Sequence, residues 1–99
     1  MLNINKEANG NNLTIALSGR LDTTTAPQLE SVVKESLDGV NALTIDCKDL
    51  AYISSAGLRV LLSTQKIMNK QGSMVVKNAS DEVKEIFDVT GFSDILTIE

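Results

Sequence analysis

The spacing of apolar residues limits the fold of this chain most strongly, because it switches several times between the two-residue period of a strand and the longer period of a helix. Near the amino terminus, apolar residues alternate with polar ones in two runs that are separated by "ANGNN". Within that separator, Asn9 and Gly10 suit the positive backbone angles of a tight hairpin turn. The sequence therefore predicts that the chain begins with two antiparallel strands.

Three later segments have the apolar spacing of amphipathic helices, each with one side that faces a core. Residues that favour helix starts and stops mark their ends. These residues are Thr24 or Thr25 and Gly39 for the first helix, Ser55 and Gly72 for the second, and Ser80 and Gly91 for the third. Short apolar runs between and after the helices, "ALTIDC", "SMVVKN" and "DILTI", have the length of buried strands.

The predicted order is β-β-α-β-α-β-α-β within a single domain of residues 1–99, because 99 residues suit one domain. Helices that alternate with strands favour right-handed crossovers and a mostly parallel sheet. We therefore predict an α/β fold in which the helices pack on that central sheet and the amino-terminal antiparallel hairpin forms one side of it.

The composition excludes several kinds of catalytic site. The chain contains no histidine, so a Ser-His-Asp or Cys-His arrangement cannot form within it, and it lacks the glycine-rich loops that bind phosphates. Cys47 is the one cysteine, and we expect a core thiol there and no zinc site. The sequence thus contains no histidine-based catalytic site and no phosphate loop, and we expect neither a metal nor a cofactor.

Charge and hydropathy limit the partners. A formal charge of −4 would repel a phosphate backbone, so we expect no nucleic acid partner. The longest apolar runs contain only a few residues, far fewer than the roughly 20 needed to cross a bilayer, and the amino terminus has no signal-peptide pattern. We therefore expect a cytoplasmic protein that does not insert directly into a membrane.

Two neighbouring serines, Ser54 and Ser55, precede the second predicted helix in "YISSAGLRVLL". The free amides and the positive dipole end of a helix amino terminus favour an anion, and phosphorylation would add about −1.5 to −2 charges there. The alternative is that Ser55 only caps the helix, which would stabilise it by about 1 kcal/mol. Position alone favours the cap.

Other polar residues lie near the ends of predicted strands, where the ligand sites of open α/β sheets gather. They are the carboxylates Asp22, Asp46 and Asp49 and the threonines Thr23, Thr24 and Thr25. Such residues more often form turns and caps than ligand sites, and we favour that interpretation for each of them.

Three segments, "LSGRLDTTTAPQLE", "ALTIDCKDLAYISSAGLRVLL" and "KNASDEVKEIFDVTGFSDIL", together resemble the STAS domain of bacterial anti-sigma factor antagonists. The resemblance extends over essentially the whole chain and implies a regulatory binding protein without catalysis of its own. In such families the unphosphorylated antagonist binds an anti-sigma factor that is also an ATP-dependent serine kinase, and so frees the sigma factor. Phosphorylation by that kinase ends the association, and a metal-dependent serine phosphatase reverses the modification.

The same resemblance places the phosphorylated residue two positions before Gly57, at Ser55, with Ser54 as the alternate. Ser54 stands where the best-characterised members carry an aspartate, and Ala56 stands where a second hydroxyl is common. With the resemblance included, we favour a regulatory Ser55 that can also cap the helix. The implied partner-binding surface consists of Asp22, Thr23, Thr24, Thr25, Ser54, Ser55, Ala56, Gly57 and Arg59.

Two other functions stay open. In the first, a STAS subunit uses the same surface to dock constitutively in a membrane-associated complex of the lipid-transport type. In the second, the domain itself binds or hydrolyses a nucleotide, although it has neither a phosphate loop nor a histidine base.

Overall fold

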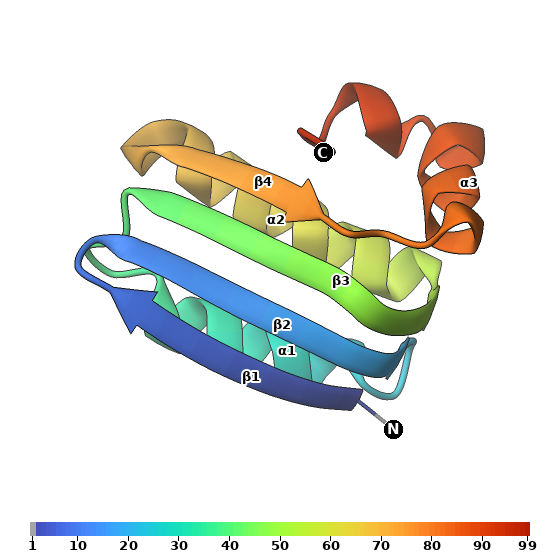
Figure 1. Cartoon of the computed structure of the whole chain (residues 1–99), viewed down its shortest axis with the longest axis horizontal. Coiled ribbons are helices and arrows are strands. Elements are labelled where there is room, and N and C mark those ends of the chain that lie inside the picture. The colour runs from blue at the N-terminus through green and yellow to red at the C-terminus, as the bar shows by residue number, and fades with distance from the viewer. Residues whose placement is uncertain (1) are drawn as a thin grey trace.

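The computed structural model describes residues 2–99 as a four-stranded sheet with two helices on one face and a third helix at one end (Figure 1). The elements are β1 (Leu2–Asn9), β2 (Asn12–Leu21), α1 (Ala26–Ser36), β3 (Ala42–Ile53), α2 (Ser55–Gln71), β4 (Ser73–Lys77), α3 (Asp81–Thr90) and the short 3-10 helix η1 (Phe92–Asp94). No helix within these residues is long and apolar enough to span a membrane.

The strands lie in the order β1-β2-β3-β4, with β1 antiparallel to β2 and the other neighbours parallel. This arrangement confirms the predicted α/β fold, with a mostly parallel sheet and an amino-terminal hairpin. The hairpin turn lies one residue later than predicted, because Asn9 pairs with Asn12 and leaves Gly10 and Asn11 to connect the strands. Gly10 has a φ of 64°, which the absence of a side chain allows at little cost.

The predicted last strand over "DILTI" is wrong in extent. Only Ile98 joins the sheet, through one isolated parallel bridge to Val76 of β4. The amides of Ile95 and Leu96 instead donate to the carbonyl of Phe92, at 3.0 and 2.8 Å. Because these bonds turn the chain at η1, too few residues are left to extend a fifth strand.

The helix ends follow local signals in most places. The Ser80 hydroxyl accepts a hydrogen bond from the Val83 amide at 3.2 Å, so Ser80 caps α3, and Gly91 ends that helix with a φ of 81°. Pro27 lies in the first turn of α1, where its missing amide hydrogen does no harm. That helix ends at Ser36, three residues before the predicted stop.

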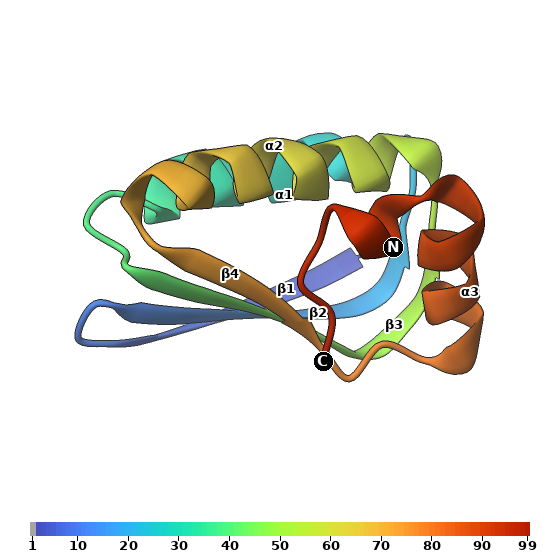
Figure 2. The same cartoon turned by 90° about the horizontal axis from the view of Figure 1, so that it is seen from above.

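The core lies between the sheet and the pair α1 and α2, while α3 closes one end (Figure 2). Alternate residues of the two central strands are buried there with aliphatic and aromatic side chains of all three helices. Members of this cluster are Leu13, Ile15, Leu17, Leu43, Ile45, Cys47, Leu29, Val33, Leu58, Leu61, Met68, Val83 and Phe87. Full burial of one such aliphatic or aromatic side chain contributes about 1.5–3 kcal/mol to stability.

Cys47 is fully buried in β3, as the sequence predicted. Burial raises the pKa of its thiol to about 12, and the nearby charge of Asp46 acts in the same direction. We therefore expect a disulfide reagent to leave Cys47 unmodified in the native protein near pH 8 and to modify it once urea unfolds the chain. Release of thionitrobenzoate, followed by absorbance, measures both cases, and rapid modification of the native protein would contradict this burial.

Candidate functional site

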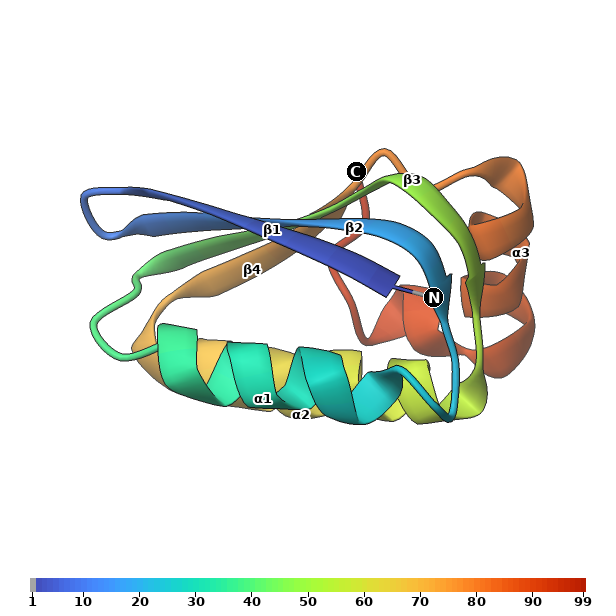
Figure 3. The same ribbon diagram turned by 90° about the horizontal axis from the view of Figure 1, so that it is seen from below.

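The carboxyl ends of β2 and β3 meet at one end of the sheet, and each strand leads into a helix on the same face. The last residues of the two strands, Leu21 and Ile53, are paired, and the Ser54 amide donates to the Leu21 carbonyl at 2.8 Å. Figure 3 shows both strands curling at this end toward the starts of α1 and α2. The structure thus brings the loop 22–25 close to the two serines.

Asp22 organises the loop between β2 and α1. Its Oδ1 accepts hydrogen bonds from the amide and hydroxyl of Thr24, at 3.0 and 2.7 Å, and from the Thr25 amide at 3.2 Å. The bond from the Thr24 hydroxyl is the largest cause that holds the pKa of Asp22 below its ordinary value. The Asp22 carboxylate is therefore ionised at neutral pH.

Thr25 and Thr23 have different places in the same loop. The buried hydroxyl of Thr25 donates to the Arg20 carbonyl at 2.8 Å and accepts from the Asp22 amide at 2.8 Å. Thr25 occupies the N-cap position of α1, but its side chain makes no capping bond to the helix, so the predicted side-chain cap is wrong. Thr23 is exposed and available for contact.

An Arg20–Tyr52 pair lies next to this loop and was not predicted from the sequence. The Arg20 guanidinium carbon is 4.4 Å from the centroid of the Tyr52 ring, and the Arg20 Nε is 3.8 Å from Asp22 Oδ2. The two residues are neighbours because they pair across β2 and β3. An alignment of the ends of β2 and β3 would have predicted this contact, because it places Arg20 opposite Tyr52.

The two serines differ in position and exposure. Helix α2 begins at Ser55, so Ser54 occupies the N-cap position that the sequence assigned to Ser55. Although the Ser54 backbone has the extended conformation usual for a cap, its hydroxyl makes no capping bond and is buried without a hydrogen-bond partner. Ser55 is exposed in the first turn.

Replacing Ser54 with alanine tests this geometry, because the direction of the change in the free energy of unfolding depends on whether the hydroxyl caps the helix. A capping serine usually contributes about 1 kcal/mol, whereas a buried hydroxyl without a partner costs about 1–3 kcal/mol. We expect Ser54→Ala to leave the free energy of unfolding unchanged or to raise it. The matched variant Ser80→Ala removes the hydroxyl that caps α3 and should lower the free energy by about 1 kcal/mol. Urea denaturation measures the free energy of unfolding of both variants. If both lost the same amount, the Ser54 hydroxyl would contribute as a cap does, which would contradict the geometry described here.

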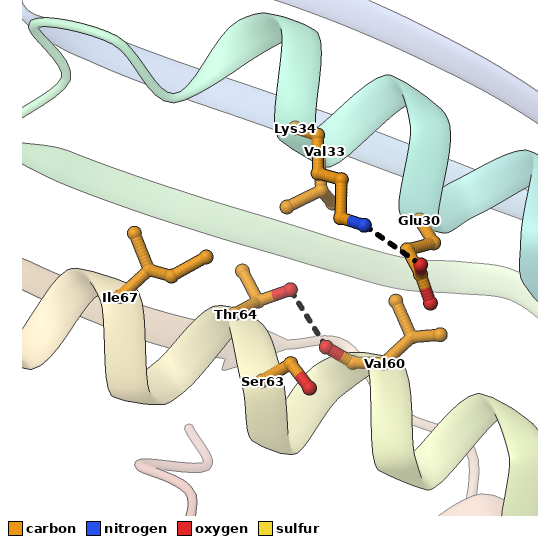
Figure 4. A pocket seen from close by; sticks show the side chains of 7 residues that line it. All are labelled: Glu30, Val33, Lys34, Val60, Ser63, Thr64 and Ile67. Atoms are coloured by element: carbon orange, nitrogen blue, oxygen red, sulfur yellow. Dashed lines mark hydrogen bonds and ion pairs between the residues drawn. The ribbon is translucent and has the colours of Figure 1, made fainter.

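A groove runs between α1 and α2 and begins next to the serines. Its first part, of about 240 Å³, has walls from both helices and from the loop before α1: Thr23, Ala26, Pro27, Glu30, Ala56, Arg59, Val60 and Ser63. Its second part, of about 140 Å³, shares Glu30, Val60 and Ser63 with the first (Figure 4). Three residues of the partner surface suggested by the sequence, Thr23, Ala56 and Arg59, thus line one groove.

Other residues that the sequence suggested for the site contribute to packing and hydrogen bonding within the domain. Gly57 is buried against Leu21, and Asp46 accepts hydrogen bonds from the Lys48 amide at 3.0 Å and from the Asn78 side chain at 3.1 Å. Asp46 and Asp49 lie within β3, so the prediction that they are turn or cap residues is wrong, because the strand continues past them to Ile53. Among residues 2–99, no three cysteine or acidic side chains gather as a metal site would require. The chemistry at this end of the sheet comes from exposed hydroxyls, the carboxylates of Asp22 and Glu30, and the cations Arg20 and Arg59.

Comparison with known proteins gives matches over nearly the whole chain. The model of the STAS domain family matches residues 3–99. The anti-sigma-B factor antagonist of Bacillus subtilis is 35% identical over 99 residues, which cover 98% of this chain and 90% of that protein.

Two solved structures share the fold. An anti-sigma factor antagonist from Mycobacterium paratuberculosis matches with a TM-score of 0.89 and 23% identity, covering 99% of this chain and 85% of that chain. The Bacillus cell fate determinant SpoIIAA in its phosphorylated form matches with a TM-score of 0.76 and 17% identity, covering 98% of this chain and 91% of that chain. Other proteins of known structure therefore adopt the same fold.

Proposed function

Because this chain belongs to the STAS domain family, we propose that it is an anti-sigma factor antagonist, a cytoplasmic regulatory protein without catalysis of its own. In its unphosphorylated form it binds an anti-sigma factor that is also a serine kinase. Phosphorylation of Ser55 by that kinase ends the association, and a serine phosphatase restores it. The 35% identity to an anti-sigma-B factor antagonist over nearly the full length of both proteins supports this role.

The observation that most favours Ser55 over Ser54 as the phosphorylated residue is the difference in their exposure. A kinase must bring the acceptor oxygen to the terminal phosphate of ATP, so the acceptor must be accessible. Ser55 is exposed, whereas the Ser54 hydroxyl is buried. Phosphorylation of Ser54 would first require its buried hydroxyl to become exposed.

The surroundings of Ser55 explain how a phosphate could act without unfolding the domain. In the first turn of α2 the phosphate would meet free backbone amides and the positive end of the helix dipole, so the helix would tolerate it. The neighbouring loop already carries the ionised Asp22 carboxylate. A phosphate here would add negative charge beside that carboxylate, and docking would be weakened by charge repulsion and by the cost of removing water from the phosphate.

The groove between α1 and α2 supports a docking surface that extends beyond the phosphorylated residue. Arg59 and Thr23 lie on opposite walls of its first part, so one partner segment could contact both. Arginine is common at the centre of protein interfaces because it forms several hydrogen bonds and also stacks on apolar groups. We therefore include Thr23, Ser55, Ala56 and Arg59 in the proposed partner surface. The other residues of the predicted surface, Asp22, Thr24, Thr25, Ser54 and Gly57, border or support it.

A native pull-down followed by phosphorylation tests the proposal. The tagged chain serves as bait in a lysate of its own cells, and the captured complex is then supplied with ATP and Mg²⁺. We expect a small ATP-binding protein of the serine kinase type to be captured, and mass spectrometry to find phosphate on Ser55. Ser54→Ala should still be phosphorylated, and Ser55→Ala should not.

The outcomes separate the competing functions. Capture of a transporter ATPase in place of the kinase would support the constitutive membrane-associated complex instead. Phosphate on Ser54 alone would contradict the assignment of Ser55, and capture of a kinase that transfers no phosphate to either serine would contradict the switch.

A further inference from the structure

The outer face of α3 exposes Val89 next to Ile86, which packs only partly against the core. Val83 and Phe87 face the core and are fully buried, whereas Val89 is 80% exposed and Ile86 is only partly buried. Ile86 and Val89 are three positions apart, so they lie on the same side of the helix. With Glu82, Glu85 and Thr90 they line a hollow of about 280 Å³. We call this surface the α3 face.

The α3 face also lies in the most acidic part of the chain. Residues 81–94 contain five acidic residues and one basic residue, a formal charge of −4, and the other eight acidic residues are balanced by eight basic ones. The whole formal charge of the protein is therefore equal to the charge of this one segment. Glu82 and Glu85 place two of these carboxylates directly at the border of the apolar hollow.

We propose that the α3 face binds a basic amphipathic segment of another protein, whose aliphatic side chains fill the hollow while its lysines or arginines pair with Glu82 and Glu85. The charge excludes phosphate-rich partners such as nucleic acids or anionic lipid surfaces, which this segment would repel. The apolar hollow selects against a purely hydrophilic basic chain, because covering Val89 contributes only if the ligand is apolar at that point. An amphipathic helix that lies in an apolar groove is a common way to satisfy both conditions.

This binding surface is separate from the one proposed around Ser55. The residues of the hollow all belong to α3, and none of them lines the groove between α1 and α2. Figure 2 shows α3 standing at the end of the sheet, outside the layer formed by α1 and α2. A variant of the α3 face can therefore lose its ligand while the proposed kinase contact is kept.

A peptide titration followed by NMR tests the proposal on the full chain. The probe is a synthetic helical peptide of about 14 residues, with two leucines four positions apart and lysines on either side. We expect weak binding, with amide shifts concentrated at residues 82–90, that weakens further as NaCl rises from about 0.05 to about 0.5 M. Val89→Ser removes the apolar contact, and the double variant Glu82→Gln and Glu85→Gln removes the two negative charges. Each of these two proteins should bind the peptide with a dissociation constant about tenfold higher than that of the parent.

Matched controls make the outcomes decisive. Ile67→Ser changes an exposed isoleucine of α2, and the pair Glu7→Gln and Glu35→Gln removes two exposed carboxylates elsewhere, so both variants should bind the peptide as the parent does. Equal binding of a peptide with the same composition but with its leucines on opposite faces would overturn the proposal, as would shifts centred outside α3. Sedimentation could also show that the chain associates with itself through the α3 face. The ligand of this face would then be a second copy of the chain, and the proposal would be overturned. Unchanged peptide binding by Ser55→Asp separates this result from any failure of the proposed switch.

Discussion

Replacing Ser55 with aspartate is expected to weaken binding of the proposed kinase partner about a hundredfold, which corresponds to about 2.7 kcal/mol. The aspartate introduces a negative charge at the start of α2, on a surface that already holds the ionised Asp22 carboxylate. Like charges brought together in an interface cost several kcal/mol because water is removed from both. Titration calorimetry with the captured kinase would measure the loss.

The same substitution should not destabilise the domain. An acidic residue in the first turn of a helix interacts favourably with the helix dipole, typically by about 0.3–1 kcal/mol, so the free energy of unfolding of Ser55→Asp should equal or exceed that of the parent. Ser31→Asp places the same charge on an exposed serine of α1 and should bind the kinase normally. If Ser55→Asp bound as tightly as the parent, or if Ser31→Asp lost binding equally, the specific effect of charge at Ser55 would be disproved.

Most of the fold could be predicted from the sequence because the signals are local. The hairpin, the three helices and the parallel strands each follow from apolar spacing and turn residues within one short segment. Where β3 ends could not be predicted in this way. Its alternation stops after Cys47, since Lys48 and Asp49 are both exposed, yet the strand continues to Ile53 by pairing with the curled end of β2. That pairing depends on the neighbouring strand and leaves no local pattern.

The site was predictable in location but not in detail. Parallel strand ends meet at one edge, so the sequence could bring the loop at Asp22 near the serines. The roles of Ser54 and Ser55 depend on a shift of one residue in the start of α2, which the Ser54 amide bond to Leu21 accompanies. Such a shift lies within the usual uncertainty of helix ends. The burial of the Ser54 hydroxyl depends on tertiary packing, and no pattern in the sequence reports it.

Substitution of Gly57 with valine is expected to lower the free energy of unfolding by about 3 kcal/mol, the upper end of the usual cost of overpacking a core. A Cβ atom at Gly57 would lie 2.6 Å from Leu21 Cγ and 3.0 Å from Ile53 Cγ1. Both neighbours are fully buried at the ends of their strands, so neither can move aside freely. Helix α2 begins so close to the sheet because residue 57 has no side chain.

A graded series distinguishes this crowding from the helix preferences of the residues. Alanine favours a helix over glycine by about 1 kcal/mol, so crowding and propensity oppose each other in Gly57→Ala, which should therefore lose less stability than Gly57→Val. Ser63→Ala, on the exposed side of the same helix, has no such crowding and should change stability little. Thermal unfolding should show Gly57→Val melting more than about 10 °C below the parent. If Gly57→Val were as stable as the parent, α2 would not depend on close contact with the strand ends. The position of Ser55 beside the Asp22 loop would then need another cause, because that contact is what holds the first turn of the helix there.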